Sequence, residues 1–198
     1  MTRAPRWVLI AQARLCLLAG RWSGALQVFE HLLARSENDA YAAASRAHLL
    51  AVRLARPDEA IAAWQRLLRT HPGRAHEWFN LGFTLEQVAR LDEALVAFAR
   101  AATLQPQLDR AWYGQGLVLM RLGRFDEAAQ ALQRCTALQP MSPHGWVQLA
   151  RVHVEQRQPD LALRIVRHLQ AFEPKVAAQL LRECGLQAHA QSRAHGHP

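Results

Sequence analysis

A period of 34 residues constrains this chain more than any other feature. The segment from Trp78 to Pro106 is nearly repeated from Trp112 to Pro140, with the same Trp, Gly, Asp-Glu-Ala and Gln-Pro elements. The same spacing relates four sets of residues: Pro72, Pro106, Pro140 and Pro174; Ala60, Ala94, Ala128 and Ala162; Trp78, Trp112 and Trp146; and Trp64, Phe98, Leu132 and Val166. A period of this length predicts an array of small repeats, each packed on the next.

Each repeat is expected to form two helices. Trp78, Leu81, Gly82 and Leu85 follow i, i+3, i+4, i+7 spacing, which is typical of one packed helical face. A glycine inside a helix costs about 1 kcal/mol, so Gly82 indicates a close approach by the partner helix, as does Gly116. The second helix should begin near Asp92-Glu93, because carboxylates in a first turn favour the positive end of the helix dipole.

The third and fourth repeats resemble the tetratricopeptide repeat family. The resemblance is carried by Trp78, Leu81 and Gly82, then by Ala94, Phe98 and the closing Pro106. It implies an all-α, right-handed superhelical solenoid of antiparallel helix pairs with a C-terminal capping helix. We expect repeats at 6–40, 41–74, 75–108, 109–142 and 143–175, a capping helix at 176–186 and a disordered tail at 187–198.

The first two repeats are degenerate. The second repeat has Ala44, Ala47 and His48 in the columns of Trp78, Leu81 and Gly82. Ala25 and Ala60 are 35 residues apart instead of 34, so we expect one extra residue near the segment 35–40.

In the resembling family, the first helix of each repeat lines a concave groove that binds the ligand. The groove residues expected here lie opposite the packed face: Arg46, Arg53, His76, Phe79, Asn80, Phe83, Arg110, Tyr113, Leu117, Met120, Arg121 and Arg151. Arginines beside aromatic anchors suit a peptide with hydrophobic and acidic residues. The sequence therefore predicts a scaffold or adaptor with a basic, aromatic groove. The alternatives are that the aromatic rings only pack between first helices and that the arginines only solvate the surface.

The first helix suggests a second mode of action. It carries Trp7, Ile10, Leu17 and Leu18 in addition to its expected core residues. An apolar edge without a preceding repeat would favour a homodimer or a partner helix. The alternative is that these residues pack onto the groove floor.

The sequence gives no indication of catalysis, so we expect a non-catalytic protein without a cofactor or metal. Motifs for zinc proteases, serine hydrolases, P-loops and dinucleotide binding are absent. His153 falls in the packed column of Leu85, and His189, His195 and His197 lie in a tail whose composition is typical of disorder. The net charge of +8 permits nucleic-acid binding, but no motif for it is present, so a protein or peptide partner is expected.

The cysteines and the apolar segments bear on the compartment. Cys16, Cys135 and Cys184 are odd in number and widely spaced, which argues against a disulfide framework. Polar residues interrupt the first apolar run, so it does not resemble a signal peptide, and no other run is long enough to span a membrane. We expect a soluble, cytoplasmic protein.

Overall fold

The computed structural model describes residues 4–186, which contain helices and no strands. The chain divides into two compact units, residues 1–104 and 105–198, here called the first and second units. The first unit contains α1 (Arg6–Leu18), α2 (Trp22–Arg35), α3 (Ala40–Val52), α4 (Pro57–Thr70), α5 (Ala75–Gln87) and α6 (Leu91–Leu104). The second unit contains α7 (Asp109–Arg121), α8 (Phe125–Leu138), α9 (Pro143–Glu155), α10 (Pro159–Gln170) and α11 (Pro174–Glu183).

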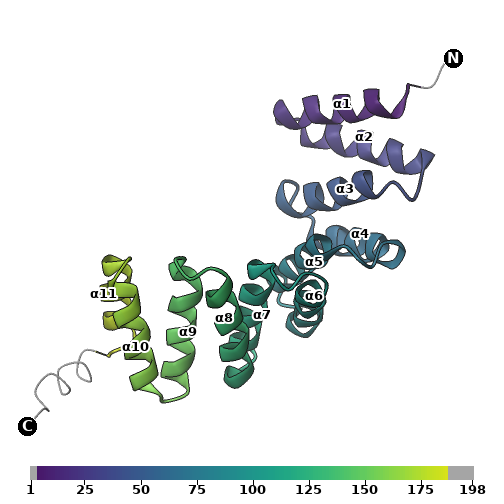
Figure 1. The fold of residues 1–198 in the computed structure, drawn as a ribbon. Helices are drawn as coiled ribbons and strands as arrows, with labels where there is room; N and C mark the ends of the chain where they lie inside the picture. The colour runs from purple at the N-terminus through teal and green to yellow at the C-terminus, as the bar shows by residue number, and fades with distance from the viewer. Residues whose placement is uncertain (1–3, 187–198) are drawn as a thin grey trace, which may run out of the picture. The chain divides into compact units, whose positions relative to one another are not determined.

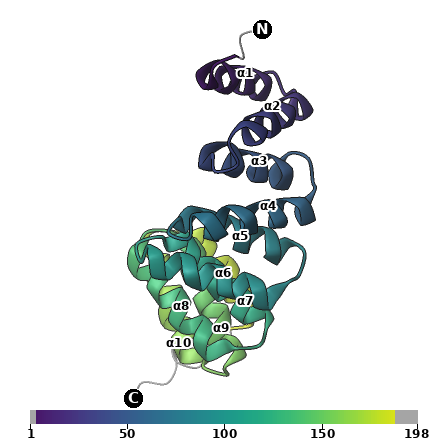
Figure 2. The ribbon, with the colours of Figure 1, turned by 90° about the vertical axis from the view of Figure 1, so that its right-hand side faces the viewer.

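In the first unit, each helix packs against the next one along the chain, and α3 also contacts α5. Figures 1 and 2 show α1, α2 and α3 as successive layers of this stack. The large side chains sealed between the layers are Phe29 of α2, Leu50 of α3, Trp64 of α4 and Phe98 of α6. Each helix buries one apolar face, as the helical spacing in the sequence predicts.

The second unit follows the same plan from α7 to α11. Figure 1 shows α8, α9, α10 and α11 side by side, and each packs on its neighbour. Leu132 of α8, Leu169 of α10 and Leu180 of α11 are almost completely buried. The predicted all-α fold, in which successive helices pack on one another, is confirmed.

The helical glycines lie at close helix–helix contacts, as predicted. A Cβ atom on Gly82 would lie 2.9 Å from Cδ1 of Phe98, and one on Gly116 would lie 2.6 Å from Cγ of Leu132. Real Cβ atoms do not approach other atoms so closely. Glycine is therefore required at both positions for the two helices of each pair to pack.

The glutamates of the repeated Asp-Glu-Ala triplet have a role beyond the helix dipole. The guanidinium of Arg90 donates to both carboxylate oxygens of Glu93, at 2.6 and 2.7 Å. Arg124 and Glu127 form the same pair with both distances at 2.7 Å, and Arg56 pairs with Glu59 in the same way. These bonds lower the pKa values of Glu93 and Glu127. Each pair ties the turn to the first turn of the following helix.

The extra residue lies in a different turn from the one that we expected. Helices α1 and α2 begin 16 residues apart, at Arg6 and Trp22, but α3 and α4 begin 17 apart, at Ala40 and Pro57. The segment near residues 35–40 has the same length as its counterparts in the later repeats. The extra residue therefore belongs to the turn between α3 and α4.

Backbone hydrogen bonds support this correction. In four of the turns the N–H before the second helix donates to a carbonyl five residues earlier, as from Arg90 to Leu85 at 3.0 Å. In the α3–α4 turn, Arg56 donates to Leu50, six residues earlier. Positions in α3 are consequently equivalent to positions 35 residues later in α5, so that fully buried Ala47 corresponds to Gly82 and Leu50 to Leu85.

A helix is present near the C-terminus, as the sequence predicts, but it begins two residues earlier than expected. The expected cap at 176–186 contains most of α11, which begins at Pro174 because proline suits the first turn of a helix. The tail predicted to be disordered, residues 187–198, lies outside the described residues. Within residues 4–186, no helix is long and apolar enough to cross a membrane.

Candidate functional site

The exposed face of the first helices gathers most of the exposed apolar side chains of the first unit. In register order, this face consists of Trp7, Ala11, Arg14 and Leu18 on α1, Tyr41, Ser45, His48 and Val52 on α3, and His76, Asn80, Phe83 and Gln87 on α5. Among the described residues, eight large hydrophobic side chains are exposed, and five of them lie on this face: Trp7, Leu18, Tyr41, Val52 and Phe83. A concentration of this kind is typical of an interaction surface.

A groove with a volume of about 620 Å³ lies on this side of the first unit. We call it the N-terminal groove. Helices α1 to α5 line it with Leu17, Leu18, Trp22, Phe29, Tyr41, Ala44, Ser45, His48, Leu49, Arg53, Trp64, Arg74, Glu77 and Asn80. The volume falls within the range of about 300–1000 Å³ that is usual for ligand sites.

The rim of the N-terminal groove carries a cation held against an aromatic ring. The guanidinium carbon of Arg53 lies 4.9 Å from the centroid of the Trp22 ring, a cation–π contact. Arg74 pairs with Glu77 at the α5 side. The groove thus combines apolar side chains with charged and polar ones, as a peptide segment with both kinds of group requires.

Two buried donors beside the groove lack a hydrogen-bond partner in the described part of the chain. They are Nε1 of Trp64 and Nε of Arg74, and both residues line the groove. Leaving a buried donor unpaired costs about 1–3 kcal/mol. An acceptor oxygen that reached this floor would remove that cost.

The predicted groove residues of the first unit do not all lie together. Asn80 and Arg53 line the N-terminal groove. His76 and Phe83 are exposed on α5, whereas Phe79 is half-buried, with ring centroids 5.7 Å from Phe98 and 6.4 Å from Phe83. Phe79 therefore packs partly against the second helix of its own repeat.

Arg46 lies away from the groove because its predicted position was shifted by one residue. It corresponds to Leu81 in the corrected register and pairs with Glu30 of α2 at 3.4 Å. The exposed face of α3 presents Tyr41 and His48 instead. This face of the first unit is therefore less basic than the sequence predicted.

In the second unit, the predicted residues occupy the outward side of α7 and α9. Arg110 and Arg121 are exposed, and Tyr113, Leu117 and Met120 are half-buried between them along α7. Arg151 of α9 donates from Nη2 to Glu183 of α11 at 2.8 Å. Part of its charge is thus already satisfied by the last helix.

Family models described as "Tetratricopeptide repeat" match residues 8–41, 47–109, 87–143 and 119–184. The chain belongs to the tetratricopeptide repeat family. Repeats of this family are protein-interaction modules.

Solved structures show the same fold. The crystal structure of a MamA protein has a TM-score of 0.79 and 18% identity, covering 86% of this chain and 93% of its own. The structure of MamA residues 41-end from Desulfovibrio magneticus RS-1 has a TM-score of 0.77 and 18% identity, and the match covers 85% of this chain and 94% of that one. YrrB is described as a TPR protein with an unusual peptide-binding site. Its crystal structure has a TM-score of 0.76 and 19% identity, and the match covers 88% of this chain and 90% of that one. No curated protein matches the sequence.

The apolar edge of this tetratricopeptide repeat chain is partly exposed. Trp7 is 71% exposed and Leu18 85%, while Ile10 and Leu17 are half-buried. Leu15, which the sequence analysis did not select, is 67% exposed on the same helix. It does not line the N-terminal groove, so it marks a separate side of α1.

Other reactive groups of this tetratricopeptide repeat chain are used in packing. His153 is buried, and its Nδ1 lies 3.1 Å from Oε1 of Gln156 and 3.0 Å from Oε1 of Gln158. Burial raises the pKa of Cys135 to about 11. Within residues 4–186, no three histidine, cysteine or acidic side chains are grouped in a way that would hold a metal.

Proposed function

We propose that this protein is a non-catalytic scaffold or adaptor that binds a segment of a partner protein in the N-terminal groove. The observation that carries the proposal is the collection of five exposed apolar side chains on one face of α1, α3 and α5. Burying such side chains on binding contributes about 25 cal/mol for each Å² removed from water. The proposed apolar contacts are Leu18 and Tyr41, which line the groove, and Val52 and Phe83, which lie on the same exposed face outside its lining.

The polar groups of the groove support a peptide as the ligand. Trp64 Nε1 and Arg74 Nε are unpaired donors, and Asn80 offers a further amide. A peptide backbone supplies a carbonyl oxygen at every residue, so it could satisfy these donors while its side chains fill the apolar centre. His48 and Arg53 then favour a segment with an acidic residue nearby.

The second unit has a proposed role of its own in this binding. Arg110, Arg121 and Arg151 accompany Tyr113, Leu117 and Met120 on the outward side of its first helices. We propose this set as the contact for an acidic and hydrophobic part of the partner. Arginine suits that role because its planar guanidinium can bind a carboxylate through two bonds.

A crosslinked pull-down from the native organism tests the groove. The baits are the wild type, the double variant Tyr41→Ala/Val52→Asp, and the control Val96→Asp. Val96 is 67% exposed on α6 and lies outside the groove face, so the control adds the same charge elsewhere. We expect a protein recovered by the wild type and the control but lost by the double variant. Equal recovery by all three baits would contradict the proposal.

The exposed edge of α1 supports a second candidate function, assembly as a homodimer. Leu15 and Trp7 are both mostly exposed, and neither lines the N-terminal groove, so a second copy of the chain could cover them. Multi-angle light scattering over a range of protein concentrations tests this, with Leu15→Glu as the variant because Leu15 does not line the groove. A dimer mass that Leu15→Glu reduces to a monomer mass would support the edge. A monomer at every concentration would exclude it.

A further inference from the structure

The second repeat lacks the tryptophan that the next three repeats share. Trp78, Trp112 and Trp146 each donate from Nε1 to the carbonyl of a proline six residues earlier, at 2.9 Å. In the corrected register, the residue equivalent to Trp78 is Ala43 of α3, and the residue equivalent to Pro72 is Glu37. The position that holds an indole ring in three repeats therefore holds only a methyl group in this one.

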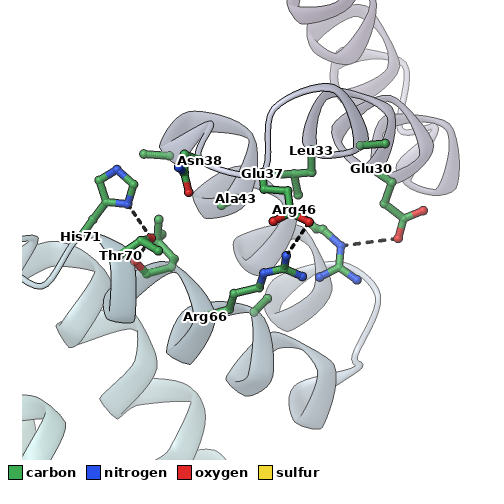
Figure 3. Close-up of a pocket in the computed structure, with 13 residues that line it drawn as sticks. Glu30, Leu33, Glu37, Asn38, Ala43, Arg46, Arg66, Thr70 and His71 are labelled. Carbon is green, nitrogen blue, oxygen red and sulfur yellow. Dashed lines mark hydrogen bonds and ion pairs between the residues drawn. The ribbon is translucent and has the colours of Figure 1, made fainter.

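A pocket is present where that ring would lie. Its volume is about 340 Å³, and α2, α3, α4 and the turn between α2 and α3 enclose it (Figure 3). Leu33, Ala43 and Ala63 line this pocket, and their counterparts Leu68, Trp78 and Ala97 line one hollow in the next repeat. We call it the Ala43 pocket. Ala43 stands here at the position that Trp78 occupies in the lining of that hollow, so the Ala43 pocket has no indole ring of its own.

Two arginine–glutamate ion pairs line the Ala43 pocket. Arg46 replaces Leu81 and is held by Glu30 at 3.4 Å, and Arg66 is held by Glu37 at 3.2 Å. Figure 3 shows the side chain of Arg46 directed to Glu30 and that of Arg66 directed to Glu37. A guanidinium near the face of an indole ring contributes about 0.5–2 kcal/mol, since the ring face is electron-rich.

The Ala43 pocket is separate from the N-terminal groove. Ala43 and His48 are five residues apart on α3, so their side chains diverge by about 140° around the helix. His48 lines the groove and Ala43 lines the pocket. A ligand in one site does not need the other.

We propose that the Ala43 pocket binds the indole ring of a tryptophan side chain that a partner protein presents. The ring enters the space beside Leu33 and Ala63, whose counterparts Leu68 and Ala97 line a hollow together with Trp78 in the next repeat. Arg46 then lies near the ring face, which gives charge complementarity between the cation and the electron-rich indole. The paired charges of Glu30, Glu37 and Arg66 favour a segment with charged residues on both sides of its tryptophan.

The probe for the test is N-acetyl-tryptophanamide, titrated into the ¹⁵N-labelled full chain and followed by NMR, with N-acetyl-leucinamide as the comparison. We expect shifts of the amides around Ala43 and Arg46 with the tryptophan amide and much smaller ones with the leucine amide. No shift in this region at saturating probe, or equal shifts with both probes, would overturn the proposal.

Ala43→Trp is the matched variant because it restores the residue found in the neighbouring repeats. We expect it to fold, to melt at a higher temperature than the wild type and to lose the tryptophan-amide shifts. Ala43→Leu, which fills the pocket with a smaller side chain, replaces it if the first variant is not folded. Retained shifts in a folded, filled variant would show that the probe binds elsewhere and would refute the site.

A second copy of this chain is the other possible source of the ring, since Trp7 is 71% exposed. Sedimentation velocity distinguishes the two. We expect no association that depends on the Ala43 pocket, so the wild type and Ala43→Trp should give the same mass at each concentration. Association that both Trp7→Ala and Ala43→Trp abolish would assign the pocket to Trp7 of a neighbouring copy and refute a partner protein.

Discussion

Arg6 holds the carboxylate of Asp39 through two hydrogen bonds, from Nε at 2.7 Å and from Nη2 at 3.0 Å. Asp39 is also the N-cap of α3 and accepts from the N–H of Ala42 at 3.1 Å. One carboxylate therefore joins the start of α1 to the start of α3. This contact fixes two first helices whose exposed faces contribute to the N-terminal groove.

Asp39 should contribute to stability in a manner that depends on pH. The hydrogen bond from Arg6 holds the pKa of the Asp39 carboxyl below its ordinary value of 3.8. A lowered pKa stabilises the fold above the ordinary value, and the contribution is lost as the pH falls through the folded value. Asp39→Asn keeps a capping side chain but not the charge. We expect its stability deficit, measured by urea unfolding at pH 7, to shrink below pH 3.8. A deficit that is constant with pH would contradict this account.

Alanine should destabilise the helical glycine positions but not a loop glycine. Gly82→Ala and Gly116→Ala would place a methyl group against Phe98 and Leu132. Overpacking of this kind costs about 1–3 kcal/mol. Gly73→Ala is the control, because nothing lies within 4 Å of a Cβ atom there. Equilibrium unfolding in urea should show two clear losses and a neutral control. Equal effects at all three positions would point to chain entropy instead of packing.

Glycine should stabilise two of the turns. Ala55 and Ala89 have φ angles of 50° and 60°, in the left-handed region, where Gly20 and Gly123 occupy the equivalent turns. This conformation costs a non-glycine residue about 1–2 kcal/mol, part of which glycine recovers. We expect Ala55→Gly and Ala89→Gly each to raise the unfolding free energy by about 0.5–1 kcal/mol. Ala62→Gly, on the exposed side of α4, should lower it by about 1 kcal/mol.

The thiol of Cys135 should react slowly in the folded protein. Its pKa is about 11, chiefly because of burial and secondarily because of the charge of Asp109. The thiolate is the reactive form, so little of it is present at pH 8. Iodoacetamide labelling at that pH, followed by mass spectrometry of the peptides, should modify Cys135 far more slowly in the folded chain than in urea. Similar rates in both states would mean that this part of α8 opens readily.

The helix pairs could be predicted from the sequence wherever a residue type fits only one kind of environment. Gly82 and Gly116 fit only where a side chain of the partner helix comes close, so their spacing predicts both the helices and the contact between them. The same is true of His153, whose column is apolar in the other repeats and which is buried here.

The exposed face of α3 could not be predicted with the same certainty. Its sequence, AYAAASRAHLLAV, is rich in alanine, and alanine fits either a buried or an exposed position. Two registers one residue apart therefore satisfy the helical pattern equally well. The length difference between Ala25 and Ala60 indicates that a residue was added, but only the turn geometry shows where. Arg46 was assigned to the wrong face of α3 for this reason.

Neither the N-terminal groove nor the Ala43 pocket could be predicted from the sequence pattern alone, although the sequence does contain one indication of the Ala43 pocket. A ring that three repeats keep and one repeat lacks suggests a hollow, once the register is known. The N-terminal groove depends on how five helices meet, so no local pattern reports it.

The wider turn between α3 and α4 has a consequence for how such arrays diverge. Its hydrogen bond from Arg56 to Leu50 closes over an additional residue while Leu50 and Trp64 on either side stay buried. The turn thus accommodates one additional residue without exposing the core residues on either side of it. Insertions at this turn allow a repeat protein to change its surface residues while its interior stays the same. The turn between α3 and α4 is therefore a suitable place to lengthen the chain by design.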